Sequence, residues 1–102
     1  MSKRTSDRKK KRLAITFSDG QVENNGMSSD FSATGLFIRT RKAFDPGTPV
    51  TMVLEVDVNR KISLTGVVAR AIKTGVIDFK NGMGIRLTSV PQAYEEFLKE
   101  LN

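Results

Sequence analysis

Alternation of apolar residues in the middle of the chain is the feature that most limits its fold. Apolar side chains occupy every even position from 50 to 56, namely Val50, Met52, Leu54 and Val56. Successive residues of a strand point to opposite faces, so this period of two predicts a strand with one buried face. Asp57 to Arg60 then reads as a hairpin connection, and Ile62 and Leu64 continue the buried face on a returning strand that runs to about Ile72.

Further short strands are predicted on both sides of this hairpin. They cover Leu13–Phe17, a polar edge strand with a loop over Gln21–Gly26, Leu36–Thr40 and Met83–Leu87, while residues 75–80 fit either a short strand or an ordered loop. Gly66 lies within the returning strand, where glycine indicates a bulge or a barrel corner. Beyond Gly66 the alternation is ambiguous, so the sequence does not decide whether Arg70 faces solvent or a ligand.

The periodicity changes near the C-terminus. Tyr94, Phe97, Leu98 and Leu101 follow the i, i+3, i+4, i+7 spacing of one helix face. Ser89 and Gln92 have the spacing of a capping box, which predicts a side-chain cap at the start of this helix. Many short strands followed by one helix predict an all-β fold, an antiparallel barrel whose opening or flank is covered by the C-terminal helix.

Composition argues against several classes of function. The 102 residues suit one domain, and the chain has no cysteine and no histidine, so the usual zinc sites and histidine-based catalysis lack their residues. We therefore expect no enzyme, no metal and no cofactor. No apolar run is long enough to cross a bilayer, which favours a soluble cytoplasmic protein without a membrane partner.

The net charge of +6 is concentrated at one end of the chain. Residues 1–12 contain seven basic and one acidic side chain, whereas the remaining residues contain ten of each. A segment this polar cannot form a core of its own, so we expect a flexible basic N-terminal arm that a polyanion could order. The simpler alternative is a basic tail that serves only solubility or nonspecific attraction.

Two sets of polar residues are chemically complementary to a guanine nucleotide. Arg8 and Arg12 lie in the basic run, and arginine pairs with phosphates and with the O6 and N7 atoms of guanine. Asp30 and Ser32 lie two residues apart, and in an extended segment they would leave the same side of the backbone, with Phe31 turned to the core. The alternative for Asp-x-Ser is a turn that caps its own backbone. We expect Gly35 either to adopt a backbone conformation that a β-carbon would forbid, or to let a ligand approach the main chain closely.

These residues resemble the signature of the PilZ domain family. The RxxxR pattern at Arg8 and Arg12 precedes the DxSxxG pattern at Asp30, Ser32 and Gly35, with one predicted strand between them. Gly82 to Leu87 is similar to the glycine-containing strand that closes many PilZ barrels. The resemblance implies a six-stranded antiparallel barrel, made of residues 13–102 after an arm of residues 1–12, that is a bacterial receptor for cyclic di-GMP.

The resemblance also implies roles for the site residues. The two arginines would bind phosphates and the Hoogsteen edge of guanine, Asp30 and Ser32 would bind another guanine edge, and Gly35 would leave room. Lys9 and Lys11 would raise the local positive potential. Binding would order the arm and change the surface offered to a partner protein of unknown identity. Two alternatives stay open, namely a PilZ-like adaptor that does not depend on cyclic di-GMP and, less favoured because stacking aromatics are few, a small barrel that binds nucleic acid.

Overall fold

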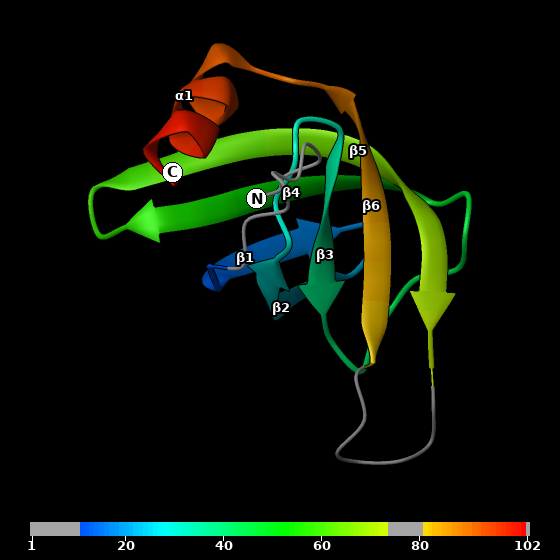
Figure 1. Cartoon of the computed structure of the whole chain (residues 1–102). Helices are drawn as coiled ribbons and strands as arrows, with labels where there is room; N and C mark the ends of the chain where they lie inside the picture. The colour runs from blue at the N-terminus through cyan, green and yellow to red at the C-terminus, as the bar shows by residue number, and fades with distance from the viewer. Residues whose placement is uncertain (1–10, 74–80, 102) are drawn as a thin grey trace, which may run out of the picture.

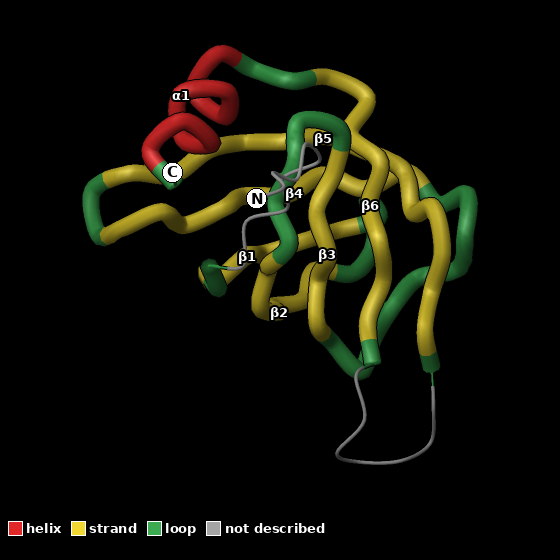
Figure 2. Tube along the Cα trace, viewed as in Figure 1, coloured by secondary structure: helices red, strands yellow, loops and turns green. Residues whose placement is uncertain are grey.

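The computed structural model describes residues 11–73 and 81–101. This part of the chain forms six strands and one helix (Figures 1 and 2). They are β1 (Leu13–Ser18), β2 (Glu23–Ser29), β3 (Gly35–Arg39), β4 (Pro49–Asp57), β5 (Arg60–Ile72), β6 (Gly82–Ser89) and α1 (Gln92–Glu100). The predicted strands and the C-terminal helix are therefore present. The possible strand at 75–80 lies outside the described residues.

The strands close into a barrel in the order β1-β2-β3-β6-β5-β4, and every neighbouring pair is antiparallel. The expectation of a six-stranded antiparallel barrel with a C-terminal helix is confirmed. The strand predicted within Gln21–Gly26 is present with different bounds, because β2 runs from Glu23 to Ser29. Glu23–Gly26 pair with β1 alone, as expected of an edge, whereas Met27–Ser29 pair with β3 as well.

The interior of the barrel contains the apolar face predicted from the alternation. Met52 of β4 lies opposite Leu64 of β5, and Leu54 lies opposite Ile62; all four side chains are buried. Side chains from β1, β3, β6 and α1 join them in one continuous core, to which β2 contributes none. Each fully buried aliphatic side chain contributes about 1.5–3 kcal/mol relative to an exposed one, so this core is the main source of stability.

Two irregularities in β5 change the direction of its side chains. The register against β6 shifts between Thr65 and Gly66, which confirms the bulge predicted at Gly66. It shifts again between Val68 and Arg70. Buried residues occupy even positions of β5 up to Val68, but the second shift ends this phase and leaves Arg70 exposed on the outside of the barrel. Arg70, whose orientation the sequence left open, therefore faces the outer surface of the barrel.

Helix α1 lies across one end of the barrel, beside the connection between β2 and β3 (Figure 1). Tyr94 and Phe97 are buried and Leu98 and Leu101 are partly buried, as the predicted apolar stripe requires. The predicted capping box is wrong: the helix begins after Pro91, and no side chain caps it.

None of the helical structure within residues 11–73 and 81–101 has the length and the apolar character needed to cross a lipid bilayer.

Candidate functional site

The connection between β2 and β3 carries the DxSxxG residues. Asp30 has a φ of 54°, in the left-handed region that aspartate tolerates better than most residues. The segment is therefore not extended at Asp30, and the expectation that Asp30 and Ser32 project together from an extended chain is wrong. Phe31 is fully buried, which confirms that it turns to the core.

Ser32 organises the turn that follows. Its backbone N–H donates to the carbonyl oxygen of Gly35 at 2.9 Å. Its hydroxyl oxygen accepts hydrogen bonds from the N–H groups of Gly35 at 3.2 Å and Thr34 at 3.3 Å. Ser32 thus caps its own backbone, the alternative that local turn chemistry offered for Asp-x-Ser.

Gly35 is fixed by close packing at the start of β3. It lies opposite Arg86 of β6, and a β-carbon at Gly35 would collide with the carbonyl oxygen of Ile85. Among the described glycines, positive φ values occur at Gly20 and Gly47, so the expectation of an unusual conformation at Gly35 is wrong. Only a residue without a side chain allows β3 and β6 to approach this closely.

A cavity of about 220 Å³ lies beside this turn, on the outside of the barrel. Asp30, Ser32 and Gly35 line one side of it, and Arg70 and Gly84 line another. The strand register explains this arrangement, because Gly84 of β6 lies opposite Arg70 of β5. The absence of a side chain at Gly84 leaves the space that Arg70 borders.

The cavity brings together charges of both signs. The carboxylate of Asp30 is partly buried and the guanidinium of Arg70 is exposed. Within the described ranges, neither group forms an ion pair. Because both groups line the same cavity, it suits a ligand that offers hydrogen-bond donors and anionic oxygens. Arg70, which the sequence left undecided, joins the candidate residues. The register shift between Val68 and Arg70 turns it outward, and the sequence did not locate this second shift.

The end of the basic run leaves the barrel close to this cavity. Lys11 and Arg12 are exposed and directly precede β1. Leu13 lies opposite Ser28, and the Ser28 hydroxyl donates to the Leu13 carbonyl oxygen at 2.7 Å. Since Ser28 is two residues from Asp30, Arg12 and the DxSxxG segment lie at the same corner of the barrel. Arg8 and Lys9 lie outside the described residues.

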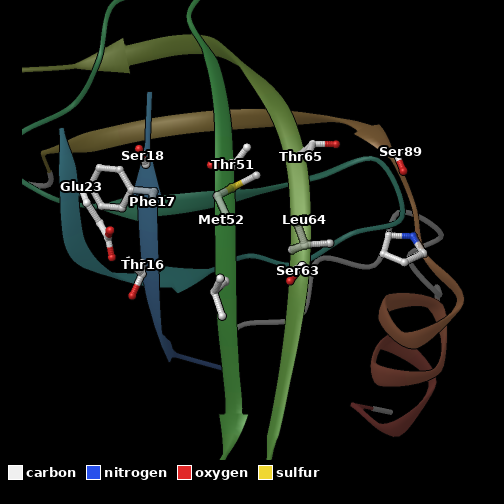
Figure 3. A pocket seen from close by; sticks show the side chains of 12 residues that line it. Thr16, Phe17, Ser18, Glu23, Thr51, Met52, Ser63, Leu64, Thr65 and Ser89 are labelled. Atoms are coloured by element: carbon white, nitrogen blue, oxygen red, sulfur yellow. The ribbon is translucent and has the colours of Figure 1, made fainter. Parts of the chain in front are cut away.

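Two larger hollows lie elsewhere on the outer surface. Figure 3 shows one of about 430 Å³ over β1, β4 and β5, lined by hydroxyl and apolar side chains such as Thr16, Thr51 and Leu64, with Glu23 as its ionisable residue. The other, of about 370 Å³, has Asp19 as its ionisable residue. The described residues that line these two hollows include no lysine or arginine, so this lining is poorly suited to phosphates. No group of three acidic side chains in the described part of the chain could hold a metal ion.

Comparison with known proteins gives a family match and a structural match. A model of the PilZ domain family matches residues 2–101. The structure of the Bacillus subtilis inhibitor of motility, MotI/DgrA, is similar with a TM-score of 0.79 at 17% sequence identity. This match covers 99% of the present chain and 50% of the other, so the chain spans half the length of MotI/DgrA. A search of the curated proteins finds no match.

Proposed function

The chain belongs to the PilZ domain family, and on this premise we propose that it is a cytoplasmic receptor for cyclic di-GMP. The observation that carries the proposal is the meeting of Arg12 and Asp30 at one corner of the barrel, through the Leu13–Ser28 hydrogen bond. It gives a single ligand access to both family motifs. The proposed role is that of a binding module and not of an enzyme.

The size of the cavity supports a site that is only partly built by the barrel. Pockets for small molecules usually measure about 300–1,000 Å³. The cavity beside Asp30 measures about 220 Å³, which suits one base better than a whole dinucleotide. The remainder of the ligand would be covered by the basic segment that precedes β1.

Each candidate residue has a role on this proposal. Arg8 and Arg12 bind phosphates and the Hoogsteen edge of guanine, where a planar guanidinium makes two parallel hydrogen bonds. Asp30 accepts hydrogen bonds from the N–H groups of a guanine, while Ser32 and Gly35 hold the turn that presents it. Lys9 and Lys11 raise the rate of association by adding positive potential.

Arg70 extends this set beyond the two motifs. Its guanidinium borders the cavity opposite Asp30, and Gly84 leaves space beneath it. A guanidinium in this position can stack on the face of a base or pair with a phosphate. We assign Arg70 to the ligand site on these grounds.

Signalling follows from the position of the basic segment. Fixing the backbone of one residue of the basic segment on ligand binding costs about 1–2 kcal/mol in conformational entropy. The charge-assisted hydrogen bonds of the arginines must offset this cost. Ligand binding would thus hold residues 1–12 against the barrel and present a new surface to a partner protein.

Calorimetric titration of the purified chain with cyclic di-GMP tests the proposal. We expect saturable binding that is lost in the Arg8→Ala/Arg12→Ala variant. The matched control is Arg41→Ala/Lys42→Ala, which removes the same charge from an exposed loop outside the cavity and should keep most of the affinity. No binding by the wild type at ligand concentrations on the order of 10⁻⁵ M would contradict the proposal and favour an adaptor.

A further inference from the structure

Helix α1 is hydrogen bonded to the turn that carries the candidate ligand residues. The Tyr94 hydroxyl donates to the carbonyl oxygen of Ser32 at 2.8 Å and lies 3.3 Å from that of Gly35. Tyr94 is fully buried, and this burial raises the pKa of its phenol. The phenol therefore stays protonated and keeps its donor at neutral pH.

A ring contact joins the same two segments at a second point. Phe31, between Asp30 and Ser32, packs against Phe97 of α1 with ring centroids 5.1 Å apart and planes at 90°. Edge-to-face pairs of this kind stabilise by about 0.5–1.5 kcal/mol beyond the area they bury. The helix thus holds the turn from the core side, while Asp30 and Ser32 line the cavity on the other side.

The far end of α1 has a separate attachment to the barrel. Arg60 of β5 donates two hydrogen bonds to the carboxylate of Glu100, at 2.9 and 2.8 Å. This ion pair contacts neither the turn nor the cavity. It therefore provides a control for loss of helix attachment without loss of the contact with the turn.

We infer that Tyr94 is a positioning residue for the ligand, acting through the Ser32 and Gly35 carbonyl groups, and that α1 is the element that responds when the cavity is filled. The inference rests on the proposed binding of cyclic di-GMP. Coupling between two sites is reciprocal. If docking of α1 holds Asp30 and Ser32 in their binding positions, then ligand binding must stabilise the docked helix.

The Tyr94→Phe variant isolates the hydroxyl, because it keeps the ring that packs beside Phe97. A lost hydrogen bond of ordinary strength corresponds to an affinity for cyclic di-GMP about three- to tenfold weaker. Phe97→Leu disturbs the second contact and should weaken binding in the same direction. The control, Glu100→Gln, should change the affinity by less than about twofold, because an exposed ion pair distant from the ligand has little effect.

Amide hydrogen exchange separates positioning from general stabilisation. In the wild type, saturating cyclic di-GMP should slow exchange at the Phe97 and Leu98 amides, and in saturated Tyr94→Phe this slowing should be smaller. A lower unfolding midpoint with unchanged affinity and unchanged ligand-induced protection would mean a structural role only and would overturn the inference. Failure of the wild type to bind would instead overturn the proposed function, and the inference with it.

Discussion

The Ser28 hydroxyl donates a 2.7 Å hydrogen bond to the carbonyl oxygen of Leu13, across the β1–β2 pair. Ser28 is fully buried, although most residues of β2 are exposed or partly exposed. The bond holds Leu13, the first residue of β1, beside the C-terminal end of β2. It thereby sets where the basic segment meets the turn that begins at Asp30.

Replacing Ser28 with alanine should lower both stability and affinity. The variant leaves the Leu13 carbonyl oxygen without this donor, which should cost about 1–2 kcal/mol in the free energy of unfolding. Urea denaturation measures this loss, and calorimetry should show weaker binding of cyclic di-GMP. Thr16→Ala is the control, because it removes an exposed hydroxyl bond to Asn25 on the same strand pair and should cost less than about 0.5 kcal/mol. Equal losses in the two variants would contradict the role given to Ser28.

Two glycine substitutions should separate filling of the cavity from disruption of the fold. A β-carbon at Gly84 would lie 3.6 Å from the Arg70 Cγ atom, an ordinary contact, so Gly84→Ala should keep the thermal midpoint and still weaken ligand binding about tenfold. Gly35→Ala should instead destabilise the barrel by about 1–3 kcal/mol, because its β-carbon meets the backbone of Ile85. Thermal unfolding and calorimetry of both variants provide the comparison. Full affinity in folded Gly84→Ala would place the ligand elsewhere.

Removing the Arg70 guanidinium should lower affinity without changing stability. A charge-assisted hydrogen bond contributes about 1.5–3 kcal/mol, so Arg70→Ala should bind about ten- to hundredfold more weakly. Arg70→Lys should restore the charge but not the planar fork, and hence recover only part of the affinity. Arg41→Ala is the control, since Arg41 is exposed and does not line the cavity. An Arg70→Ala variant with wild-type affinity would remove Arg70 from the site.

The Arg60–Glu100 ion pair should make the contribution of α1 docking depend on pH. The side-chain hydrogen bond from Arg60 holds the pKa of Glu100 below its ordinary value of 4.5, and the same bond raises the pKa of Arg60. A carboxylate with a lowered pKa stabilises the fold at pH values above 4.5, and this stabilisation is lost as the pH falls through the lowered value.

Thermal unfolding midpoints of the wild type and of Glu100→Gln should therefore differ at neutral pH and converge as the pH falls through the lowered pKa of Glu100. The difference at pH 7 should be small and should shrink at high salt, because both side chains are exposed to solvent. A difference that grew toward low pH would contradict the assignment.

The barrel was predictable because its strongest strands show their buried face in the sequence. The alternation from Val50 to Leu64 reports directly on the core. β2 was harder to predict, because most of its residues are polar and exposed or partly exposed, so no buried face marks its bounds in the sequence. Arg70 was undecidable for a related reason: the shift that turns it outward depends on the pairing of β5 with β6.

The motif residues were recognisable, but their geometry was not. Spacing alone placed Asp30 and Ser32 on one side of an extended segment. In the structure Asp30 has a left-handed backbone conformation and Ser32 caps a turn. The apolar stripe correctly assigned Tyr94 to the buried face of a helix. Periodicity identifies a face but not a partner, so it could not reveal the bond from the Tyr94 hydroxyl to Ser32.

Closure of the barrel limits how a partner protein could recognise it. Each of the six described strands is paired on both sides, from the β1–β2 contact around to the β1–β4 contact. Closure is incomplete along the strands, because Arg60–Leu64 of β5 pair with β4 alone and Glu23–Gly26 of β2 pair with β1 alone. Addition of a foreign strand, a mode of recognition that many sheet proteins use, is therefore confined to short stretches such as these. Elsewhere a partner must contact side chains, on the outer walls of the barrel, its connecting turns or its helix.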